Sequence, residues 1–591
     1  MTTEDYQKNL AECYLDNEQR IILESNANTI IKAGPGSGKT RVLTLKAAKL
    51  LLENIKMPRG LACITYTNKA TQELKNRLNI YGIGYRKNLF IDTIHKFCMN
   101  NILYPFASIY NKEQLLTYKI ITTKSKTIMD KFYDDNSIPK NNRSSWNIFF
   151  KEYRYTNYKK QQEAENWYNK YANTFYDKNC INFDLVMDEC YELLQNNYIC
   201  KCIESKYPYI LIDEYQDSSL AMHSLFKILM EKTNIVFYIV GDPNQSIYSF
   251  TASSPKYYNE LYKTGNFNKI ELKKNYRTHN NIFSIVKNFL LKNDTIPAIN
   301  TNTNCYFKKC SNLNSQIEYI ASNILPKLIS KGILPKDICI LYRDYHTENV
   351  IIDVLTKNNI SFTNNNKIYV SKDYNDSELV IFIEDLILWL LNKNKNDKDL
   401  TYKGLFSDYL KILYKNKILS NETKKELKVN LYKKLIIYQN SHETLLKDFI
   451  NYLNDNINLK NLIELNNKDE LDAYKSIYEK IQDYTLEQFA DVIESENAIR
   501  ILSAHSSKGL EYKAVIIPDL EDGRYPTWSA ESEEALNEEK RLLFVATTRA
   551  KEYLFILASG FYTSYGKQFN KGISRFFNDI KSMFLDCDNF D

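Results

Sequence analysis

The chain has 591 residues, of which 44% are hydrophobic and 25% are charged. This length exceeds what one hydrophobic core supports, and it predicts about three to five domains of a soluble globular protein. The net charge is only +6, which excludes a basic nucleic-acid coat protein. Any DNA binding must therefore come from local patches.

The sequence shows no targeting or membrane signal. The first residues, Met1–Asp5, are polar and acidic, so no signal peptide is expected. The nearest approach to a membrane span, Leu379–Leu391, is interrupted by Glu384 and Asp385. Eleven cysteines without a C-x-x-C pair predict reduced thiols in the cytoplasm. The four cysteines within 180–202 leave a metal cluster open as an alternative, although their spacing fits no zinc pattern.

The first chemical signal along the chain is a glycine-rich turn. It follows the apolar run Thr29–Ile31, precedes a helical pattern, and reads Ala33-Gly34-Pro35-Gly36-Ser37-Gly38-Lys39-Thr40. Strand, glycine-rich turn and helix is the context of a phosphate-binding loop, here with Ala33 where the strict pattern has glycine. Backbone N–H groups and the helix N-terminus would hold phosphates. Lys39 would reach the β- and γ-phosphates, and the Thr40 hydroxyl would ligate magnesium.

The first half of the chain alternates between strand and helix patterns. Gly60–Thr65 predicts a buried strand, and Asn68–Leu78 predicts an amphipathic helix after it. Residues from about 96 to 185 are helical, aromatic and rich in lysine, which is typical of an inserted subdomain. Strands return at Tyr209–Asp213 and Ile235–Val240. Such alternation predicts a parallel sheet covered on both faces.

A second alternating block begins near residue 283. It contains the predicted strand Ile338–Tyr342 and a loop at Asn364–Asn366. From about 375 to 490 the chain is helical, polar and rich in Asn and Lys, which predicts a second insert. Strand patterns resume at Ile499–Leu502 and Ala514–Ile517. The second half therefore repeats the organisation of the first.

Polar side chains follow two of the predicted strands. Asp213 and Glu214 end one strand, at the edge where an open parallel sheet binds its ligands. Asp213 would hold magnesium, and Glu214 would orient and deprotonate the attacking water. Gln245 follows the next strand and is placed to sense a γ-phosphate. An Asp-Glu pair alone is more often a solvated turn, but its position behind a phosphate loop favours catalysis.

Five further segments follow the phosphate loop in a fixed order: Asp213–Ser218, Gly241–Tyr248, Asn275–Thr278, Ala504–Tyr512 and Glu539–Ala550. Together they resemble superfamily 1 DNA helicases of the UvrD/Rep type, which include PcrA-like enzymes. The likeness covers nearly the whole chain and is weakest in the two inserts.

The resemblance implies an α/β fold of two RecA-like P-loop cores with parallel sheets, each carrying a mainly helical insert. ATP is then expected in the cleft between the cores. The implied parts are a first core (1–95 and 186–282), its insert (96–185), a second core (283–375 and 491–591) and its insert (376–490).

The resemblance also implies roles around ATP. An amide that can both donate and accept suits adenine recognition, and planar guanidinium groups suit the charge of a transferring phosphoryl group. By position, these roles fall on Gln19 (adenine amide), Tyr276 (adenine stacking), Arg277 and Arg549 (arginine fingers from the second core and its edge), Arg41 (nucleotide site) and Glu511 (ribose).

Contacts to single-stranded DNA are implied in the same way. Aromatic rings on which bases stack would make such contacts independent of sequence. Each ring could instead be ordinary core packing. The implied residues are Tyr66, Asn68, His95, Tyr248, Phe250, His505 and Lys508.

The resemblance implies an ATP- and Mg2+-dependent translocase that moves 3′-to-5′ on single-stranded DNA and unwinds tailed duplexes, in repair, replication or antiphage defence. The chain departs from the family at Ser249–Thr251, where arginines are common, and its second insert is short. The short insert motivates an alternative, a DNA-stimulated ATPase that regulates a partner nuclease and has little unwinding activity of its own. The compact form resembles the helicase subunit of the Gabija antiphage system, whose partner is an OLD-like nuclease.

Overall fold

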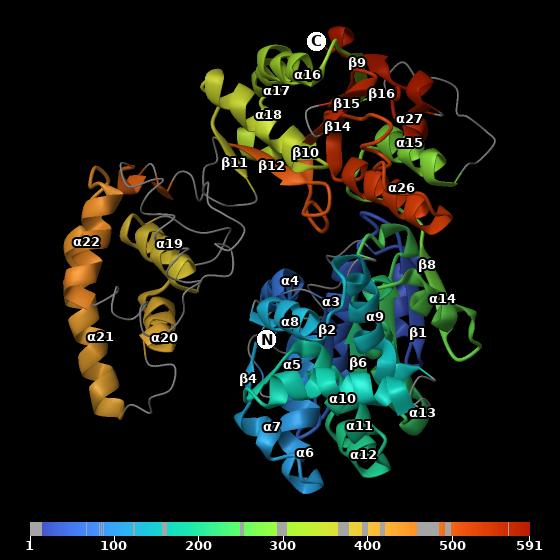
Figure 1. Ribbon diagram of the computed structural model, residues 1–591, viewed down its shortest axis with the longest axis vertical. Coiled ribbons are helices and arrows are strands. Elements are labelled where there is room, and N and C mark those ends of the chain that lie inside the picture. The colour runs from blue at the N-terminus through green and yellow to red at the C-terminus, as the bar shows by residue number, and fades with distance from the viewer. Residues whose placement is uncertain are drawn as a thin grey trace. The chain divides into compact units, whose positions relative to one another are not determined.

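The structure is a computed structural model that describes residues 15–590 apart from 67, 82, 84–85, 87, 122–123, 157–161, 249–252, 292–303, 365–377, 393–399, 414–419, 458–483, 488, 491–497, 565–566 and 579. The chain divides into two compact units. Unit 1 comprises the chain up to Asn280 together with Ser532–Phe544. Unit 2 comprises Asn281–Glu531 and the chain from Val545 onward. Each unit is built on its own sheet (Figure 1).

The sheet of unit 1 has six strands in the order β3-β2-β6-β7-β1-β8, and every pairing in it is parallel. The α/β class and the parallel sheet are confirmed. The strands are β1 (Thr29–Ala33), β2 (Leu61–Thr65), β3 (Leu89–Thr93), β6 (Tyr209–Ile212), β7 (Val236–Gly241) and β8 (Asn268–Leu272). The flanking helices are α2 (Asn17–Glu24), α3 (Lys39–Lys49), α4 (Asn68–Ile80), α13 (Leu220–Lys232) and α14 (Pro255–Lys263).

Both faces of this sheet are buried. Neighbouring residues of one strand belong to different hydrophobic cores, as Ile30 and Ile31 of β1 do. Cys63 and Ile64 of β2 likewise belong to different cores. Since side chains alternate between the faces of a strand, continuous apolar runs are what a sheet covered on both sides requires.

A mainly helical stretch separates β3 from β6 in the chain. It also contains a short parallel pair, β4 (Lys119–Ile120) with β5 (Cys180–Ile181). Its longer helices are α8 (Lys124–Asp135), α9 (Arg143–Glu152), α10 (Gln162–Tyr176), α11 (Phe183–Leu194) and α12 (Asn197–Lys206), preceded by α5 (Ile94–Cys98).

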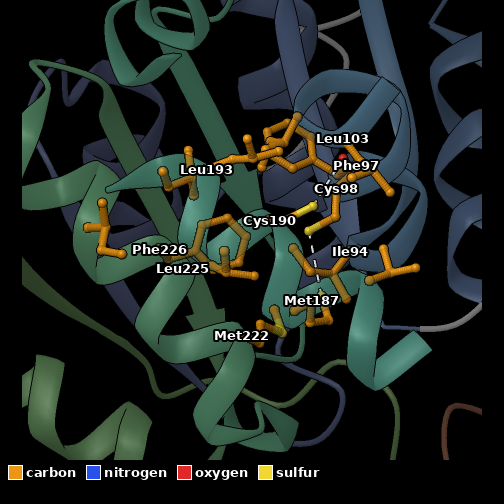
Figure 2. Close-up of a cluster of buried hydrophobic side chains, with 14 of the residues drawn as sticks. Ile94, Phe97, Cys98, Leu103, Met187, Cys190, Leu193, Met222, Leu225 and Phe226 are labelled. Carbon is orange, nitrogen blue, oxygen red and sulfur yellow. Dashed lines mark hydrogen bonds between the residues drawn. The ribbon is translucent and has the colours of Figure 1, made fainter. Parts of the chain in front are cut away.

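Figure 2 shows how this stretch is fixed to the sheet's own helices. Phe97 and Cys98 of α5 lie against Met187 and Cys190 of α11, and Leu225 of α13 closes the cluster. All five side chains are buried. Helices α5 and α11 are thereby held as one packed body, and both carry residues of the site described below.

The sheet of unit 2 has seven parallel strands in the order β11-β12-β10-β13-β14-β9-β17. The strands are β9 (Cys305–Lys309), β10 (Ile338–Tyr342), β11 (Phe362–Asn364), β12 (Ile499–Ser503), β13 (Tyr512–Ile517), β14 (Ala550–Ala558) and β17 (Leu585–Asp586). Helices α15 (Asn280–Leu291), α16 (Leu313–Tyr319), α17 (Leu325–Ser330) and α18 (Tyr345–Lys357) accompany it. Helix α26 (Glu533–Thr547) belongs to unit 1 up to Phe544.

Four helices between β11 and β12 share a separate hydrophobic core, and Figure 1 shows them as one group. The apolar run noted in the sequence is the first of these helices, in which Glu384 and Asp385 are also buried. No helix in the described part of the chain is long and apolar enough to cross a membrane. The four are α19 (Glu378–Leu390), α20 (Tyr402–Leu413), α21 (Asn421–Leu435) and α22 (Leu446–Ile457).

The cysteine cluster considered from the sequence is wrong. The thiols of Cys180, Cys190 and Cys200 each donate to a backbone carbonyl. Among the described residues, no group of three or more His, Cys, Asp or Glu side chains could hold a metal ion. These three cysteines are buried packing residues, Cys180 on strand β5 and the other two on helices.

Candidate nucleotide and nucleic-acid sites

The phosphate loop joins β1 to α3, as the sequence predicts. Gly36 and Gly38 have φ angles of +67° and +80°, a region that residues with a Cβ atom rarely adopt. A Cβ atom on Gly36 would lie 2.6 Å from the Cβ atom of Arg277. Gly38 caps α3, so the positive end of the helix dipole faces the turn. The loop therefore has the backbone of an anion cradle.

Two carboxylates lie at the same edge of the sheet as the loop. Strand β7 lies between β6 and β1, so the residues after β6 and β7 meet beside the turn that follows β1. Asp213 follows β6, and Asp242 follows β7; both are buried. Burial raises the pKa of Asp213 to about 6, and it also raises the pKa of Asp242. Buried acids at this edge are positioned for work on a cation or a phosphate.

Lys39 and Glu214 contact each other directly, although they are far apart in the chain. The Lys39 Nζ atom donates to Oε1 of Glu214. Burial alone would lower the pKa of Lys39, but the carboxylates of Glu214, Asp213 and Asp242 outweigh burial and raise it. The ammonium group is thus charged. Glu214 itself stands at a φ of +54°, a strained conformation for a residue other than glycine.

Gln216 connects the two strand ends and was given no role from the sequence. Its amide nitrogen donates to Oε2 of Glu214 over 2.5 Å, and its amide oxygen accepts from the backbone N–H of Asp242 over 3.0 Å. The sequence did contain a signal for such a role, because Gln216 and Asp242 lie in two of the segments that carry the resemblance to helicases. Gln245, which was predicted, donates to Oδ2 of Asp242 over 2.6 Å and is buried.

The oxygen atoms at this edge suit magnesium. Thr40 is the second residue of α3 and Asp213 follows β6, so a hydroxyl and a carboxylate flank the loop. Mg2+ prefers such hard oxygen ligands and takes few of them from protein, with phosphate oxygens and water completing its shell. The donor set therefore fits the ion. Arg41, also assigned to the nucleotide site, is half-buried on the same helix.

Tyr276 and Arg277 lie in unit 1, although the resemblance implied that the second core and its edge supply the arginine fingers. The segment that contains them is hydrogen-bonded to the phosphate loop. The backbone N–H of Tyr276 donates to the Gly36 carbonyl over 2.8 Å. Asn275 donates its side-chain amide to the Pro35 carbonyl over 2.7 Å, and its amide oxygen accepts from the N–H of Arg277. The loop and this segment form one hydrogen-bonded structure.

Gln19 is 1% exposed, and its amide is engaged within the protein. Its amide nitrogen donates to the Ser37 carbonyl over 3.2 Å, and its amide oxygen accepts from the N–H of Asp16 over 3.4 Å. Gln19 thus supports the phosphate loop in this conformation. Adenine recognition by this amide would require an exchange of hydrogen bonds.

Two further nucleotide-site candidates lie in unit 2. Arg549 is 1% exposed, and its guanidinium donates to the Val545 and Leu510 carbonyls and to the Thr548 hydroxyl. Glu511 is paired with Lys551 over 2.5 Å. Arg549 is therefore buried, whereas the side chain of Glu511 is 39% exposed within its ion pair. Unit 2 holds both by contacts of its own.

Two of the DNA-contact candidates of unit 1 line a cavity of about 410 Å3. Tyr66 and His95 line it. The rings of Tyr66 and Tyr248 stack with centroids 6.3 Å apart, and those of His95 and Phe183 lie 4.4 Å apart. Phe183, which sequence reasoning missed, also lines the cavity, and burial lowers the pKa of His95. Aromatic rings of this kind suit stacked bases, and the charged residues Lys151, Glu152 and Asp184 share the walls with them.

Four DNA-contact candidates remain, namely Asn68, Phe250, His505 and Lys508. Asn68 begins α4, but its side chain lies outside the described residues, as does all of Phe250. His505 and Lys508 lie in unit 2, where burial, aided by Arg343, lowers the pKa of His505 to about 4. That histidine is neutral at physiological pH and would contact DNA as a hydrogen-bonding group.

These observations define a class: a P-loop nucleoside-triphosphatase of two parallel-sheet units, with an aromatic cavity beside the nucleotide edge. Two family models match the chain. Residues 15–266 match the UvrD/REP helicase N-terminal domain, and residues 270–376 and 385–560 match the UvrD-like helicase C-terminal domain. The chain belongs to the UvrD/Rep-like superfamily 1 helicases, and it is an ATP-dependent DNA helicase.

Curated relatives agree at modest identity. A probable DNA helicase II homolog of Mycoplasma capricolum is 27% identical over 93% of this chain and 84% of its own length. The ATP-dependent DNA helicase Rep of Buchnera aphidicola from Acyrthosiphon pisum is 26% identical over 95% of this chain and 97% of its own. The ATP-dependent DNA helicase PcrA of Staphylococcus aureus is 26% identical, with coverages of 97% and 87%.

Proposed function

We propose that the protein is a cytoplasmic, Mg2+-dependent translocase that moves 3′-to-5′ along single-stranded DNA and unwinds tailed duplexes, in repair, replication or antiphage defence. The family likeness supports the direction. The observation that supports the motor role is the contact between Lys39 and Glu214. Lys39 ends the phosphate loop after β1, and Glu214 follows β6, which is separated from β1 by β7. This contact joins a phosphate-binding cation to a base in one buried site.

In this proposal the resting contact is exchanged when nucleotide enters. Thr40 and Asp213 would hold Mg2+, which supplies positive charge at the phosphates when bound. Lys39 moves its ammonium from Glu214 to the β- and γ-phosphates. Glu214, still held by Gln216, then accepts a proton from the attacking water. Gln245, fixed on Asp242, reports the state of the γ-phosphate to the segment that carries Tyr248.

The remaining residues serve coupling and DNA. Arg277 and Arg549 neutralise charge on the transferring phosphoryl group, and Arg41 and Glu511 contact the nucleotide. Bases stack in the cavity of Tyr66, His95 and Phe183. Each hydrolysis cycle moves the core formed by 1–95 and 186–282 past the core formed by 283–375 and 491–591.

A strand-displacement assay tests this function. Equal concentrations of 3′-tailed and 5′-tailed duplexes are incubated with the protein, ATP and Mg2+, and displaced strand is measured over time. We expect release from the 3′-tailed duplex alone. Exclusive use of the 5′ tail, or equal use of both, would contradict the proposed direction. ATP hydrolysis without displacement of either strand would favour the sensor that regulates a nuclease.

A further inference from the structure

The side chain of Tyr276 is held by two neighbours while much of it remains accessible. Its hydroxyl donates to Oδ2 of Asp16 over 2.7 Å. The Nζ atom of Lys274 lies 4.9 Å from the centre of its ring, within the range of a cation–π contact. The residue is 43% exposed. A large ring is thus presented to solvent in a defined orientation.

Asp16 links that ring to the phosphate loop. Its Oδ1 atom accepts from the N–H of Gln19 over 2.7 Å and so caps α2. The amide oxygen of Gln19 accepts in turn from the N–H of Asp16, and its amide nitrogen donates to the Ser37 carbonyl of the loop. A helix cap needs one acceptor oxygen. The second oxygen of Asp16 serves Tyr276 instead.

The other end of Tyr276 is fixed to the same loop. Its backbone N–H donates to Gly36, and Asn275 before it donates to Pro35. Two independent routes therefore set the ring's position relative to the phosphate cradle. One runs through the backbone, and the other runs through Asp16 and Gln19. A ring ordered before the ligand arrives costs less entropy on binding.

We propose that Asp16 is a positioning residue that orients the ring of Tyr276 for stacking on the base of ATP. The inference rests on the proposed function, which gives Tyr276 that stacking role. Asp16 then contributes to affinity for a nucleotide and not to affinity for phosphates alone. The loss of its second oxygen weakens ATP binding about three- to tenfold, the range expected for one hydrogen bond.

The test is calorimetric titration of the full chain with Mg-ATP and, separately, with Mg-tripolyphosphate, which lacks the base. Asp16→Ser keeps a capping oxygen but loses the second acceptor. Asp16→Asn keeps both a cap and a polar partner for the Tyr276 hydroxyl. Tyr276→Phe removes only the hydroxyl, and Tyr276→Ala removes the ring. Asn196→Ser, an exchange at the cap of α12, is the matched control.

We expect Asp16→Ser and Tyr276→Phe to weaken ATP binding about three- to tenfold each, and the double variant to be no weaker than either. Asp16→Asn restores most of the affinity. Tripolyphosphate binding and the thermal midpoint stay at the wild-type value, as they do in Asn196→Ser. In steady-state hydrolysis, Asp16→Ser raises KM for ATP by the same factor and changes kcat less than twofold.

Three results would overturn the inference. If Asp16→Ser weakens ATP and tripolyphosphate equally, its role is structural. If Asp16→Ser binds ATP normally while Tyr276→Ala does not, the ring stacks without help from Asp16, and the proposed function stands. If Tyr276→Ala also binds ATP normally, the stacking role itself fails, and the inference fails with it.

Discussion

The two arginines assigned to the transferring phosphoryl group are held in contrasting ways. Arg277 belongs to a segment whose backbone is bonded to the phosphate loop of unit 1. Arg549 lies in unit 2, where its guanidinium donates hydrogen bonds to carbonyl and hydroxyl oxygens of the same unit. In the proposed function, Arg277 would act from a segment already held beside the phosphate loop, whereas Arg549 would have to release internal bonds before it could act. The contrast would then separate nucleotide binding from the trigger for hydrolysis.

The largest effect distinguishes the two arginines. Arg277→Ala and Arg549→Ala should each lower DNA-stimulated kcat by about 10^3-fold or more, the range of an arginine finger. Only Arg549→Ala should also lower the free energy of unfolding, by about 2–4 kcal/mol, because it orphans buried acceptors. Steady-state hydrolysis and urea unfolding measure the two quantities. Equal losses of stability in both variants would remove the contrast.

Glu214→Gln should lower kcat by about 10^2- to 10^4-fold, because a carboxamide cannot take a proton from water. Affinity for ATP should persist or rise, since Lys39 loses its resting partner. Single-turnover hydrolysis and equilibrium binding of Mg-ATP check both statements. The control is Glu260→Gln, a partly exposed acid on α14. Full hydrolysis by Glu214→Gln would show that the base has been assigned wrongly.

Removal of a ring from the cavity should weaken binding to single-stranded DNA. Stacking on one base contributes about 1–3 kcal/mol, so Tyr66→Ala and Phe183→Ala should each raise Kd about 5- to 150-fold. Fluorescence anisotropy with a labelled oligonucleotide measures the change. Hydrolysis without DNA should stay at the wild-type rate. Tyr452→Phe, on α22, loses one hydroxyl bond and serves as the control. Unaltered Kd values in both variants would exclude the cavity as the DNA site.

The smallest predicted effect is a loss of Mg2+ affinity at low pH. Asp213 has a pKa of about 6, raised chiefly by burial, so its carboxyl becomes protonated as pH falls through that value. The neutral form cannot ligate Mg2+ well, and apparent Mg2+ affinity should therefore fall about tenfold per pH unit below 6. Hydrolysis measured against Mg2+ concentration at pH 5 to 8 shows this, with excess Mg2+ restoring the rate. A flat Mg2+ requirement across that range would oppose the assignment.

The sequence predicted several buried strands from their continuous apolar runs, but it missed other strands, both exposed and buried. Ile338–Tyr342 and Ile235–Val240 are continuous apolar runs, and the structure confirms a strand at each. Strand β8 was not predicted, because three of its five residues are exposed at the sheet edge and include two charged ones. Strand β14, just after Arg549, was not predicted either, although its last five residues are apolar and buried.

The candidate site shows the same division. The contact of Lys39 with Glu214 follows from motif order and sheet topology. The role of Gln216 depends on which strand ends are neighbours. The hydrogen bond from Asn275 to Pro35, which holds the segment of Arg277 beside the phosphate loop, joins residues 240 positions apart. Neither can be read from local pattern. In the sequence, Phe183 cannot be distinguished from an aromatic residue of the core. In the structure, its ring lies beside that of His95.

The central claim, that the loop carrying Lys39 is the ATP site of a DNA motor, is tested most directly by one comparison. DNA-stimulated hydrolysis is measured for the wild-type protein and for Lys39→Ala, with thermal unfolding as the check on folding. We predict that single-stranded DNA stimulates the wild type, and that Lys39→Ala loses at least a hundredfold in rate while keeping its thermal midpoint. Hydrolysis by Lys39→Ala at the wild-type rate would contradict the account.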